Sequence, residues 1–324
     1  MRVLITGASG FAGSWLCRQC AEAGDAVVAL SRRGTVPDGC GRGMAVDLRD
    51  GEAVRDAVRR AAPELVYHLA SLSSVGRSWE APAQTLGDND AITVSMLEAL
   101  RHVAGGAPVV WVSSCEIYGV PEVLPATEGL APRPANPYAV SKAAGEMLAR
   151  VYAEAYGLEI VVARPFSHSG PGQLPIFLLS SLASQAAEGL RAGVTRLEVV
   201  TGNPDTRRDF TDVRDVVRAY RMLAHAVISG TPGASGGVFN VSSGRSVSAA
   251  EQVALLTELV APIEVQHVVD PARVRASEVM DLRGDPARIR ALTGWEPAIP
   301  LRQTMADTIA WWERRQERPR TPAA

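Results

Sequence analysis

Short apolar runs separated by helical patterns fill the first half of the chain. These runs show little alternation of apolar and polar residues, which is typical of strands buried on both faces of a parallel sheet. Strands are predicted at 2–6, 26–30, 65–69, 109–113 and 159–164. Helices are predicted between them at 11–23, 51–62, 83–102 and 138–156. Strands that alternate with helices in this way predict a doubly wound α/β fold around a parallel sheet.

The pattern changes after residue 165. Segment 166–175 is rich in Gly, Pro and Ser and is predicted to be a loop. Beyond it, helices are expected at 177–188, 213–228, from 248 onward and at 301–316, and strands at 197–201, 238–241 and 265–269. We expect residues 1–165 and 210–245 to form the sheet domain. A smaller interleaved C-terminal lobe is expected from 166–209 and 246–316, followed by a frayed tail at 317–324.

The composition narrows the class of protein. Hydrophobic residues make up 47% of the 324 residues and charged residues 21%, which favours a large core and argues against disorder. The net charge is −2, and no basic stripe or tail points to a nucleic acid. We find no apolar run of about 18 residues and no apolar N-terminal segment of signal-peptide length. We therefore expect a soluble cytoplasmic protein with no nucleic-acid or membrane partner.

The four cysteines give little sign of metal or redox chemistry. Cys17 and Cys20 have the Cys-x-x-Cys spacing, but both fall inside a predicted helix. Neither Cys40 nor Cys115 supplies a second pair at the spacing of a zinc site. Buried, inert thiols in a reducing compartment are expected, and no metal site.

A glycine-rich loop follows the first predicted strand and opens the first predicted helix. Its sequence, Gly7-Ala8-Ser9-Gly10-Phe11-Ala12-Gly13, has the spacing Gly-x-x-Gly-x-x-Gly. Glycines there allow a tight turn and let a pyrophosphate approach the N–H groups at a helix N-terminus. In this strand–loop–helix context the motif predicts a Rossmann dinucleotide-binding domain. The contacts are expected at Gly7, Ser9, Gly10, Phe11, Ala12 and Gly13.

The end of the second predicted strand indicates the type of dinucleotide. An acidic residue there would bind the ribose 2′-OH of NAD, but the chain has Ser31, Arg32 and Arg33 instead. A hydroxyl and two guanidinium groups suit a 2′-phosphate, which predicts NADP(H), with NAD(H) as the alternative. The competing interpretation is two solvated surface arginines. Further cofactor contacts are expected near other strand ends, at Asp47, Leu48, Leu69, Ala70, Ser71 and Pro165.

A tyrosine and a lysine form the candidate catalytic pair. Lys142, the one lysine among 33 Lys and Arg residues, follows Tyr138 by four residues, so both side chains share a helix face. Ser114 ends the preceding strand at the carboxyl edge of the sheet. A phenol with a pKa near 10 is a poor base at neutrality, but a nearby ammonium favours its ionised form. Such a pair is common on helices; together with the glycine loop and Ser114 it predicts proton transfer coupled to hydride transfer.

These features resemble the extended short-chain dehydrogenase/reductases, the family of nucleotide-sugar epimerases, dehydratases and reductases. The resemblance runs from residue 2 to about 314 and implies that Ser114, Tyr138 and Lys142 are catalytic, with Tyr138 and Lys142 also touching the cofactor. Segments 74–79, 164–173 and 275–279 are similar to family members that act on GDP-linked 4-keto-6-deoxy sugars. The activity implied is NADPH-dependent reduction of GDP-4-keto-6-deoxy-D-mannose to GDP-D-rhamnose.

The resemblance also implies a site for the GDP-sugar. Arg208, Arg275 and Glu278 would hold the diphosphate end, because a forked guanidinium binds phosphate oxygens well. The competing view is that these charged loop residues are solvated. Ser167 stands where the family commonly has Asn. The remaining substrate contacts are expected at Ser73, Ser114, Cys115, Glu116, Ser167 and His168.

Two alternatives and one assembly prediction remain. Glu116 stands where related 4,6-dehydratases have a glutamate that abstracts a sugar proton, so it is a further catalytic candidate. The activity of a GDP-mannose 4,6-dehydratase, or of another nucleotide-sugar epimerase or dehydratase, is therefore an alternative. Cys115, however, replaces an acid of the dTDP-glucose dehydratases. A non-catalytic NADP(H)-sensing protein is the second alternative. The resemblance also implies a homodimer in which helices 83–102 and 138–156 form a four-helix bundle; otherwise their apolar faces are core.

Overall fold

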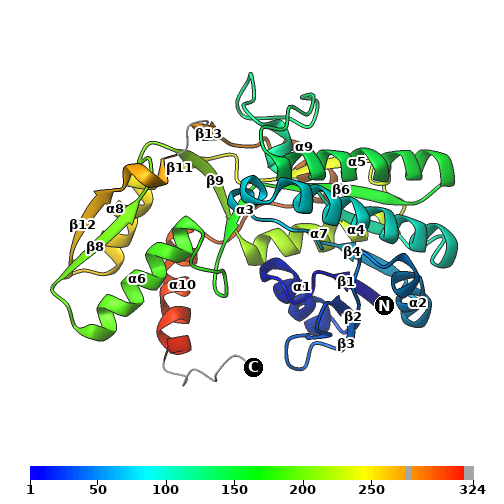
Figure 1. The fold of residues 1–324 in the computed structure, drawn as a ribbon, viewed down its shortest axis with the longest axis horizontal. Helices are drawn as coiled ribbons and strands as arrows, with labels where there is room; N and C mark the ends of the chain where they lie inside the picture. Colours follow the sequence, from blue (N-terminus) through cyan, green and yellow to red (C-terminus); the bar gives the residue numbers. More distant parts are fainter. Residues whose placement is uncertain (275–278, 317–324) are drawn as a thin grey trace.

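The computed structural model describes residues 1–274 and 279–316, and its centre is a parallel sheet. Seven strands follow the order β10-β6-β5-β4-β1-β2-β3 (Figure 1). This order confirms the predicted doubly wound fold. β3 was not predicted, because it is short and contains Arg and Gly beside Met and Ala. The strands are β1 (Arg2–Thr6), β2 (Ala26–Ser31), β3 (Arg42–Ala45), β4 (Leu65–His68), β5 (Val109–Val112), β6 (Ile160–Pro165) and β10 (Val238–Val241).

Helices cover both faces of the sheet because each inner strand buries both of its faces. In β1, Val3 and Ile5 belong to one hydrophobic core and Leu4 to the other, as the alternation of side chains along a strand requires. One face packs against α1 (Phe11–Glu22), α7 (Val213–Ile228) and α9 (Ala287–Thr293). The other packs against α2 (Gly51–Ala61), α4 (Pro82–Val103) and α5 (Pro137–Tyr156).

A smaller lobe lies beside the sheet domain, at the left of Figure 1. A separate hydrophobic core, which includes Leu182, Leu256 and Trp312, joins its helices to its strand pair. The elements of the lobe are α6 (Leu178–Ala192), β8 (Arg196–Thr201), α8 (Ala249–Leu259), β12 (Glu264–Val269) and α10 (Leu301–Gln316). Short elements complete the chain: α3 (Val75–Glu80), η1 (Cys115–Tyr118) and η2 (Pro271–Arg273).

A small sheet lies between the two parts and corrects one prediction. Segment 166–175 was expected to be loop throughout, but β7 (Ser167–Ser169) pairs in parallel with β9 (Arg207–Asp212). The partner strand is about forty residues further along the chain, so no local pattern reveals the pairing. β9 also pairs with β11 (Ser246–Ser248) and β13 (Asp281–Leu282).

A late segment returns to the sheet domain, although the sequence placed residues 246–316 in the lobe. Ile289 and Trp295 are completely buried in the core around β1. The Trp295 indole N–H donates to the Asp215 carbonyl oxygen at 3.0 Å. The Asp215 carboxylate accepts the N–H groups of Ala298 and Ile299 at 2.8 Å each. Long-range packing against α7 thus decides where this segment lies.

Three further features concern membranes, metals and thiols. Across residues 1–274 and 279–316, no helix is both long and apolar enough to cross a membrane. The same residues contain no cluster of three His, Cys, Asp or Glu side chains suited to a metal ion. The four cysteines are buried free thiols, as expected. Burial raises the pKa of Cys17 and of Cys20 to about 12, which keeps both thiols protonated and unreactive.

Candidate active site

The glycine loop has the geometry that its motif predicts. Gly7 adopts a left-handed backbone with φ of 69°, and its carbonyl accepts the Gly10 N–H at 2.9 Å. A Cβ on Gly13 would lie 2.2 Å from the Gly7 oxygen, so no larger residue fits there. Gly10 precedes α1 without a side-chain cap, and the first turn carries no acidic side chain. The loop therefore offers backbone N–H donors and a positive helix end, which fits the pyrophosphate of a dinucleotide.

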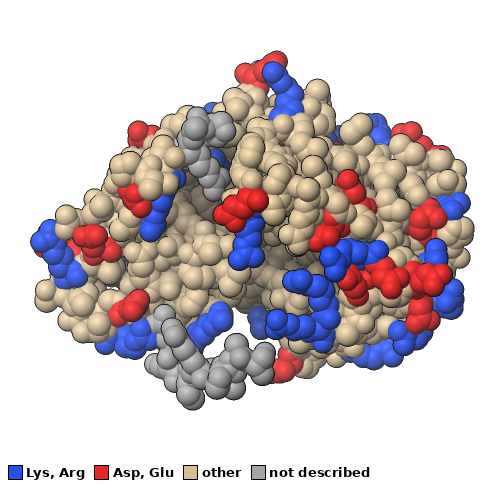
Figure 2. All heavy atoms as spheres, in the orientation of Figure 1, with Lys and Arg blue, Asp and Glu red and all other residues tan. Residues whose placement is uncertain are grey.

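The arginines after β2 line an open pocket of about 440 Å³ together with Ser9 and Thr35. Both Arg32 and Arg33 are exposed. In Figure 2, Lys and Arg atoms gather on part of the rim of the hollow that separates the lobe from the sheet domain. The Ser31 hydroxyl donates to the Thr35 carbonyl at 3.2 Å and so shapes the turn. The lining of this pocket fits an anionic group such as a 2′-phosphate.

The end of β4, next to this loop, holds three of the other predicted cofactor residues. Leu69 and Ala70 each donate a backbone N–H to the Thr6 hydroxyl oxygen at 3.2 Å. A Cβ on Gly7 would lie 3.0 Å from the Ala70 nitrogen, so the two loops are in close contact. Ser71 follows, and Pro165 ends β6 in a buried position.

Asp47 and Leu48, the predicted cofactor residues that follow β3, have different surroundings from each other. The Asp47 carboxylate binds the Arg49 guanidinium at 2.6 Å, and this hydrogen bond lowers the pKa of Asp47 to about 2. Leu48 is buried in the core beneath α2, so its side chain faces away from solvent. Asp47 is therefore an exposed, ionised group, while Leu48 has only backbone to offer a ligand.

The structure brings Ser114 and Tyr138 together. The Asn136 side chain caps α5 by accepting the Ala139 N–H at 2.8 Å, and Tyr138 occupies the first turn. The phenol is 8% exposed. Burial raises the pKa of Tyr138, and the hydrogen bond with Ser114 lowers it in part. The balance is a phenol that stays protonated at neutral pH.

Lys142 lies one turn further along α5, and the pKa of Tyr138 is not lowered as the sequence predicted from this lysine. Its ammonium donates to the Val112 carbonyl at 2.5 Å. Burial lowers the pKa of Lys142 to about 8, against the opposing charge of Glu146. The sequence predicted that this ammonium lowers the pKa of Tyr138, but desolvation of the phenol outweighs all other effects.

Glu116 is held at the same edge by a residue that sequence reasoning missed. Its carboxylate accepts the Asn136 amide N–H at 2.9 Å, while its own backbone N–H donates to the Ser114 hydroxyl at 3.2 Å. Burial keeps the pKa of the neighbouring Cys115 thiol well above its usual range. Asn136 thus links Glu116 to the start of α5. Its place before Pro137 was a helix-capping signal that could have identified it.

The small sheet, which carries three of the predicted substrate residues, packs against the segment that holds Cys115, and the charge of Arg208 is close enough to lower the pKa of that thiol in part. The His168 ring is stacked parallel to the Phe11 ring of the cofactor loop, 6.0 Å between centroids. Arg208 donates to the carbonyls of Arg207 and Val279 at 2.8 and 2.7 Å. Ser167 is half-buried on β7, and Ser73 is exposed before α3. Arg275 and Glu278 fall outside the described residues.

Comparison with known proteins identifies the family. The model of the GDP-mannose 4,6-dehydratase family matches residues 4–308, nearly the whole chain. The chain belongs to this family of extended short-chain dehydrogenase/reductases. It is 38% identical to the GDP-6-deoxy-D-mannose reductase of Pseudomonas aeruginosa, over 97% of this chain and 98% of that protein. It is 32% identical to the dTDP-glucose 4,6-dehydratase of Streptomyces griseus, over 96% and 94% of the two chains.

Solved structures of the same family agree with the fold. RMD from Pseudomonas aeruginosa, solved with NADPH, superimposes with a TM-score of 0.83 at 34% identity, covering 97% of this chain and 100% of that one. The UDP-glucose 4-epimerase of Thermus thermophilus, solved with NAD, gives 0.82 at 31% identity over 96% and 99%. The chain is therefore an enzyme of a family that uses nicotinamide cofactors, and the alternative of a non-catalytic sensor has no support among these relatives.

Proposed function

We propose that this enzyme reduces the 4-keto group of GDP-4-keto-6-deoxy-D-mannose with NADPH, giving GDP-D-rhamnose. The observation that carries the proposal is the 38% identity to a GDP-6-deoxy-D-mannose reductase over nearly the whole of both chains. The site supports it, because the Ser114 hydroxyl is close enough to the Tyr138 phenol to lower its pKa in part, and both lie at the carboxyl edge of the sheet, where the glycine loop also lies. We place the GDP end of the substrate toward the smaller lobe, near Arg208.

The site residues divide the chemistry among them. NADPH supplies the hydride when it is bound, and the backbone N–H groups after Gly10 hold its pyrophosphate. Ser114 aligns the carbonyl oxygen at C4, and Tyr138 donates a proton to that oxygen. A reduction needs the phenol in its protonated form, which is the form that burial favours. Lys142 holds the nicotinamide ribose in place.

The direct test mixes the purified protein with NADPH and GDP-4-keto-6-deoxy-D-mannose and follows the absorbance of the reduced nicotinamide. We expect NADPH to be consumed one for one with the keto sugar. A wild-type protein that binds NADPH but leaves it unoxidised in the presence of this sugar would refute the proposal.

Glu116 and the family model favour a second candidate, the 4,6-dehydration of GDP-mannose. In that reaction Glu116, held by Asn136 at 2.9 Å, would be the base. A dehydratase returns its hydride, so it converts GDP-mannose without net loss of NADPH. Nucleotide-sugar analysis with GDP-mannose as the only sugar separates the two candidates. Glu116→Gln would then abolish the dehydration.

The arginines after β2 predict a preference for NADPH. Replacing Arg32 with Ser is expected to raise the KM for NADPH by roughly 10- to 100-fold, because charge-assisted hydrogen bonds to the 2′-phosphate are lost. Arg33→Ser should act in the same direction. The KM for NADH should stay within about two-fold, since NADH has no such phosphate. Arg59→Ser, at an exposed position of α2, is the control. Equal losses for both cofactors would contradict the prediction.

We also propose a homodimer built on α4 and α5, which lie side by side. Val140, Met147 and Val151 share one face of α5 at helical spacing and are 42%, 64% and 54% exposed, and Val94 of α4 is 44% exposed. Met147→Glu is expected to give a monomer by light scattering, because a dimer would desolvate the added charge. Val123→Glu, in an exposed loop, should leave the mass unchanged. A wild-type monomer would exclude this assembly.

Four free thiols suit a reducing compartment, and we propose that the enzyme works in the cytoplasm.

A further inference from the structure

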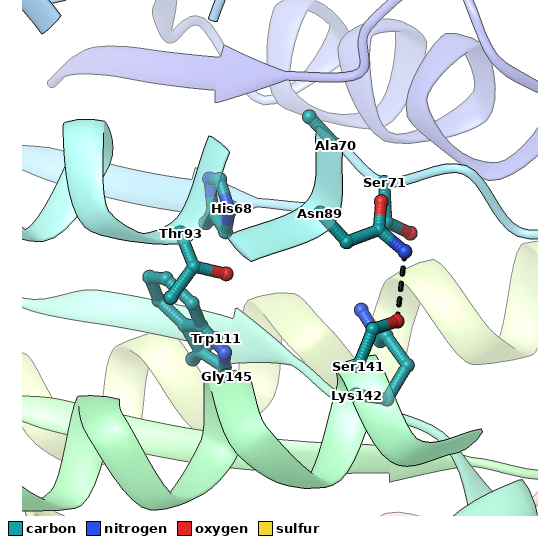
Figure 3. A pocket seen from close by; sticks show the side chains of 9 residues that line it. All are labelled: His68, Ala70, Ser71, Asn89, Thr93, Trp111, Ser141, Lys142 and Gly145. Carbon is teal, nitrogen blue, oxygen red and sulfur yellow. Dashed lines mark hydrogen bonds between the residues drawn. The ribbon is translucent and has the colours of Figure 1, made fainter. Parts of the chain in front are cut away.

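A small cavity lies against Lys142, between β4, β5, α4 and α5. Its volume is about 10 Å³, close to the size at which a polar cavity holds one water. Its lining includes the polar side chains of His68, Ser71, Asn89, Thr93, Ser141 and Lys142. Figure 3 shows these side chains arranged around one space, with Asn89 bonded to Ser141 at 2.8 Å. The polar lining therefore offers one water more hydrogen-bond partners than it can use.

The hydrogen bonds of Thr6 fix the protonation of His68. The Thr6 hydroxyl oxygen accepts the N–H groups of Leu69 and Ala70, which uses both of its lone pairs. Its own proton is left for the Nδ1 atom of His68, 3.0 Å away. Nδ1 is therefore an acceptor, and the proton of the neutral ring is on Nε2.

The surroundings of His68 keep it neutral. The side chain is 3% exposed and stacks on Trp111 with ring centroids 4.2 Å apart. Burial, with a smaller contribution from the charge of Lys142, lowers the pKa of His68 to about 3. A neutral His68 can donate from Nε2 without placing a second positive charge beside Lys142.

Lys142 needs acceptors on the side that faces this cavity. An ammonium has three protons, of which one goes to the Val112 carbonyl. The charged or titratable groups that bear on it are Glu146, four residues later on α5, and the neutral His68 on β4. α4 contributes only the uncharged Asn89 and Thr93 to the lining. Glu146 is itself paired with Arg164, so it supplies charge rather than a direct bond.

We propose that one water in this cavity accepts hydrogen bonds from His68 Nε2 and Lys142 Nζ, so that His68 is a positioning residue for the lysine. The protons of that water go to the hydroxyl oxygens of Ser71 and Thr93. His68 then fixes the water, and the water with the Val112 carbonyl fixes the direction of the ammonium. This inference rests on the catalytic role proposed for Lys142.

The one lysine of the chain allows a direct test. Protein labelled with ¹³C,¹⁵N-lysine gives a single lysine side-chain signal, from which the pKa of Lys142 is measured by NMR. His68→Phe keeps a ring against Trp111 but removes the donor. The pKa should fall by about one unit, because the ammonium loses an anchored acceptor. His68→Gln keeps a polar amide, so the pKa of Lys142 in this variant should return most of the way to the wild-type value. A pKa in His68→Phe equal to that of the wild type overturns the proposal.

A second measurement needs neither variant. The ¹⁵N shifts of the His68 ring should show the Nε2-protonated tautomer, unchanged from about pH 5 to pH 9. A proton on Nδ1, or titration in that range, overturns the proposal.

Thr6→Val removes the hydroxyl proton that fixes Nδ1 as an acceptor, and it replaces His68→Phe if that variant does not fold. It should lower the pKa of Lys142 in the same direction, and no change overturns the proposal.

Turnover separates positioning from a purely structural role. In His68→Phe we expect kcat to fall roughly ten-fold and the pH profile of kcat to move with the pKa of Lys142. His68→Gln should recover most of the rate. A lower Tm with an unchanged kcat and pH profile would mean that His68 is only structural. The NMR measurements need no turnover, so a failure of the proposed reductase activity remains distinguishable from a failure of this inference.

Discussion

Tyr138→Phe is expected to lower kcat for NADPH-dependent reduction by about 10³-fold, within the range that a positioned acid contributes. The change removes only the phenolic oxygen, which is the proton donor in the proposed mechanism. The ring is 8% exposed and packed at the start of α5, so the fold should survive. The glycine loop is untouched, and the Kd for NADPH, measured by fluorescence titration, should stay within about three-fold of the wild type.

A tyrosine on the same helix provides the control. Tyr156 is 50% exposed at the far end of α5, and Tyr156→Phe should retain full activity. Single-turnover kinetics would show whether the loss lies in the chemical step or in product release. If Tyr138→Phe reduces the keto sugar at the rate of the wild type, another group supplies the proton and the mechanism must be abandoned.

Glu146→Ala is expected to lower the free energy of unfolding by about 3–5 kcal/mol, because it leaves a buried guanidinium without its partner. Arg164 is 5% exposed and binds both oxygens of Glu146, with its Nε atom at 3.2 and 3.1 Å. Arg164 also donates to the Tyr118 hydroxyl at 2.9 Å, and Tyr118 donates to Asn240 at 2.7 Å. The network therefore joins α5 to η1, β6 and β10.

Urea unfolding followed by circular dichroism measures this effect. Glu154→Ala on the same helix is the matched control, since its pair with Arg150 is exposed and should contribute less than about 1 kcal/mol. The double variant Glu146→Leu/Arg164→Met should recover most of the stability, because no unpaired charge remains. A loss for Glu146→Ala as small as that for Glu154→Ala would show that Arg164 finds water or another acceptor.

The buried pair also explains how α5, the helix of the candidate catalytic residues, is held. Lys142 and Glu146 are one turn apart on α5, so the charge that raises the pKa of Lys142 is itself fixed by Arg164 of β6. Burial acts in the opposite direction and is the larger effect. Loss of the Glu146 carboxylate should therefore lower the pKa of Lys142 further, in addition to destabilising the fold.

The sequence alone predicted six of the seven strands of the sheet, the glycine loop and the candidate catalytic cluster. Each of these depends on local signals: apolar runs for the strands, the spacing of Gly7, Gly10 and Gly13, and the four-residue interval from Tyr138 to Lys142. Because parallel strands all present their carboxyl ends at one edge, a residue such as Ser114 at a strand end could be placed beside that helix without coordinates. The chemistry proposed for the site followed from these few rules.

Only the tertiary structure decided the features that depend on residues far apart in the chain. The pairing of β7 with β9, the return of Trp295 to the sheet domain and the Glu146–Arg164 pair are of this kind. The direction of the pKa shift of Tyr138 is another, since burial in the folded chain outweighs the charges near it. Spacing along a chain fixes which side chains share a face, whereas desolvation and partner choice depend on everything packed around them.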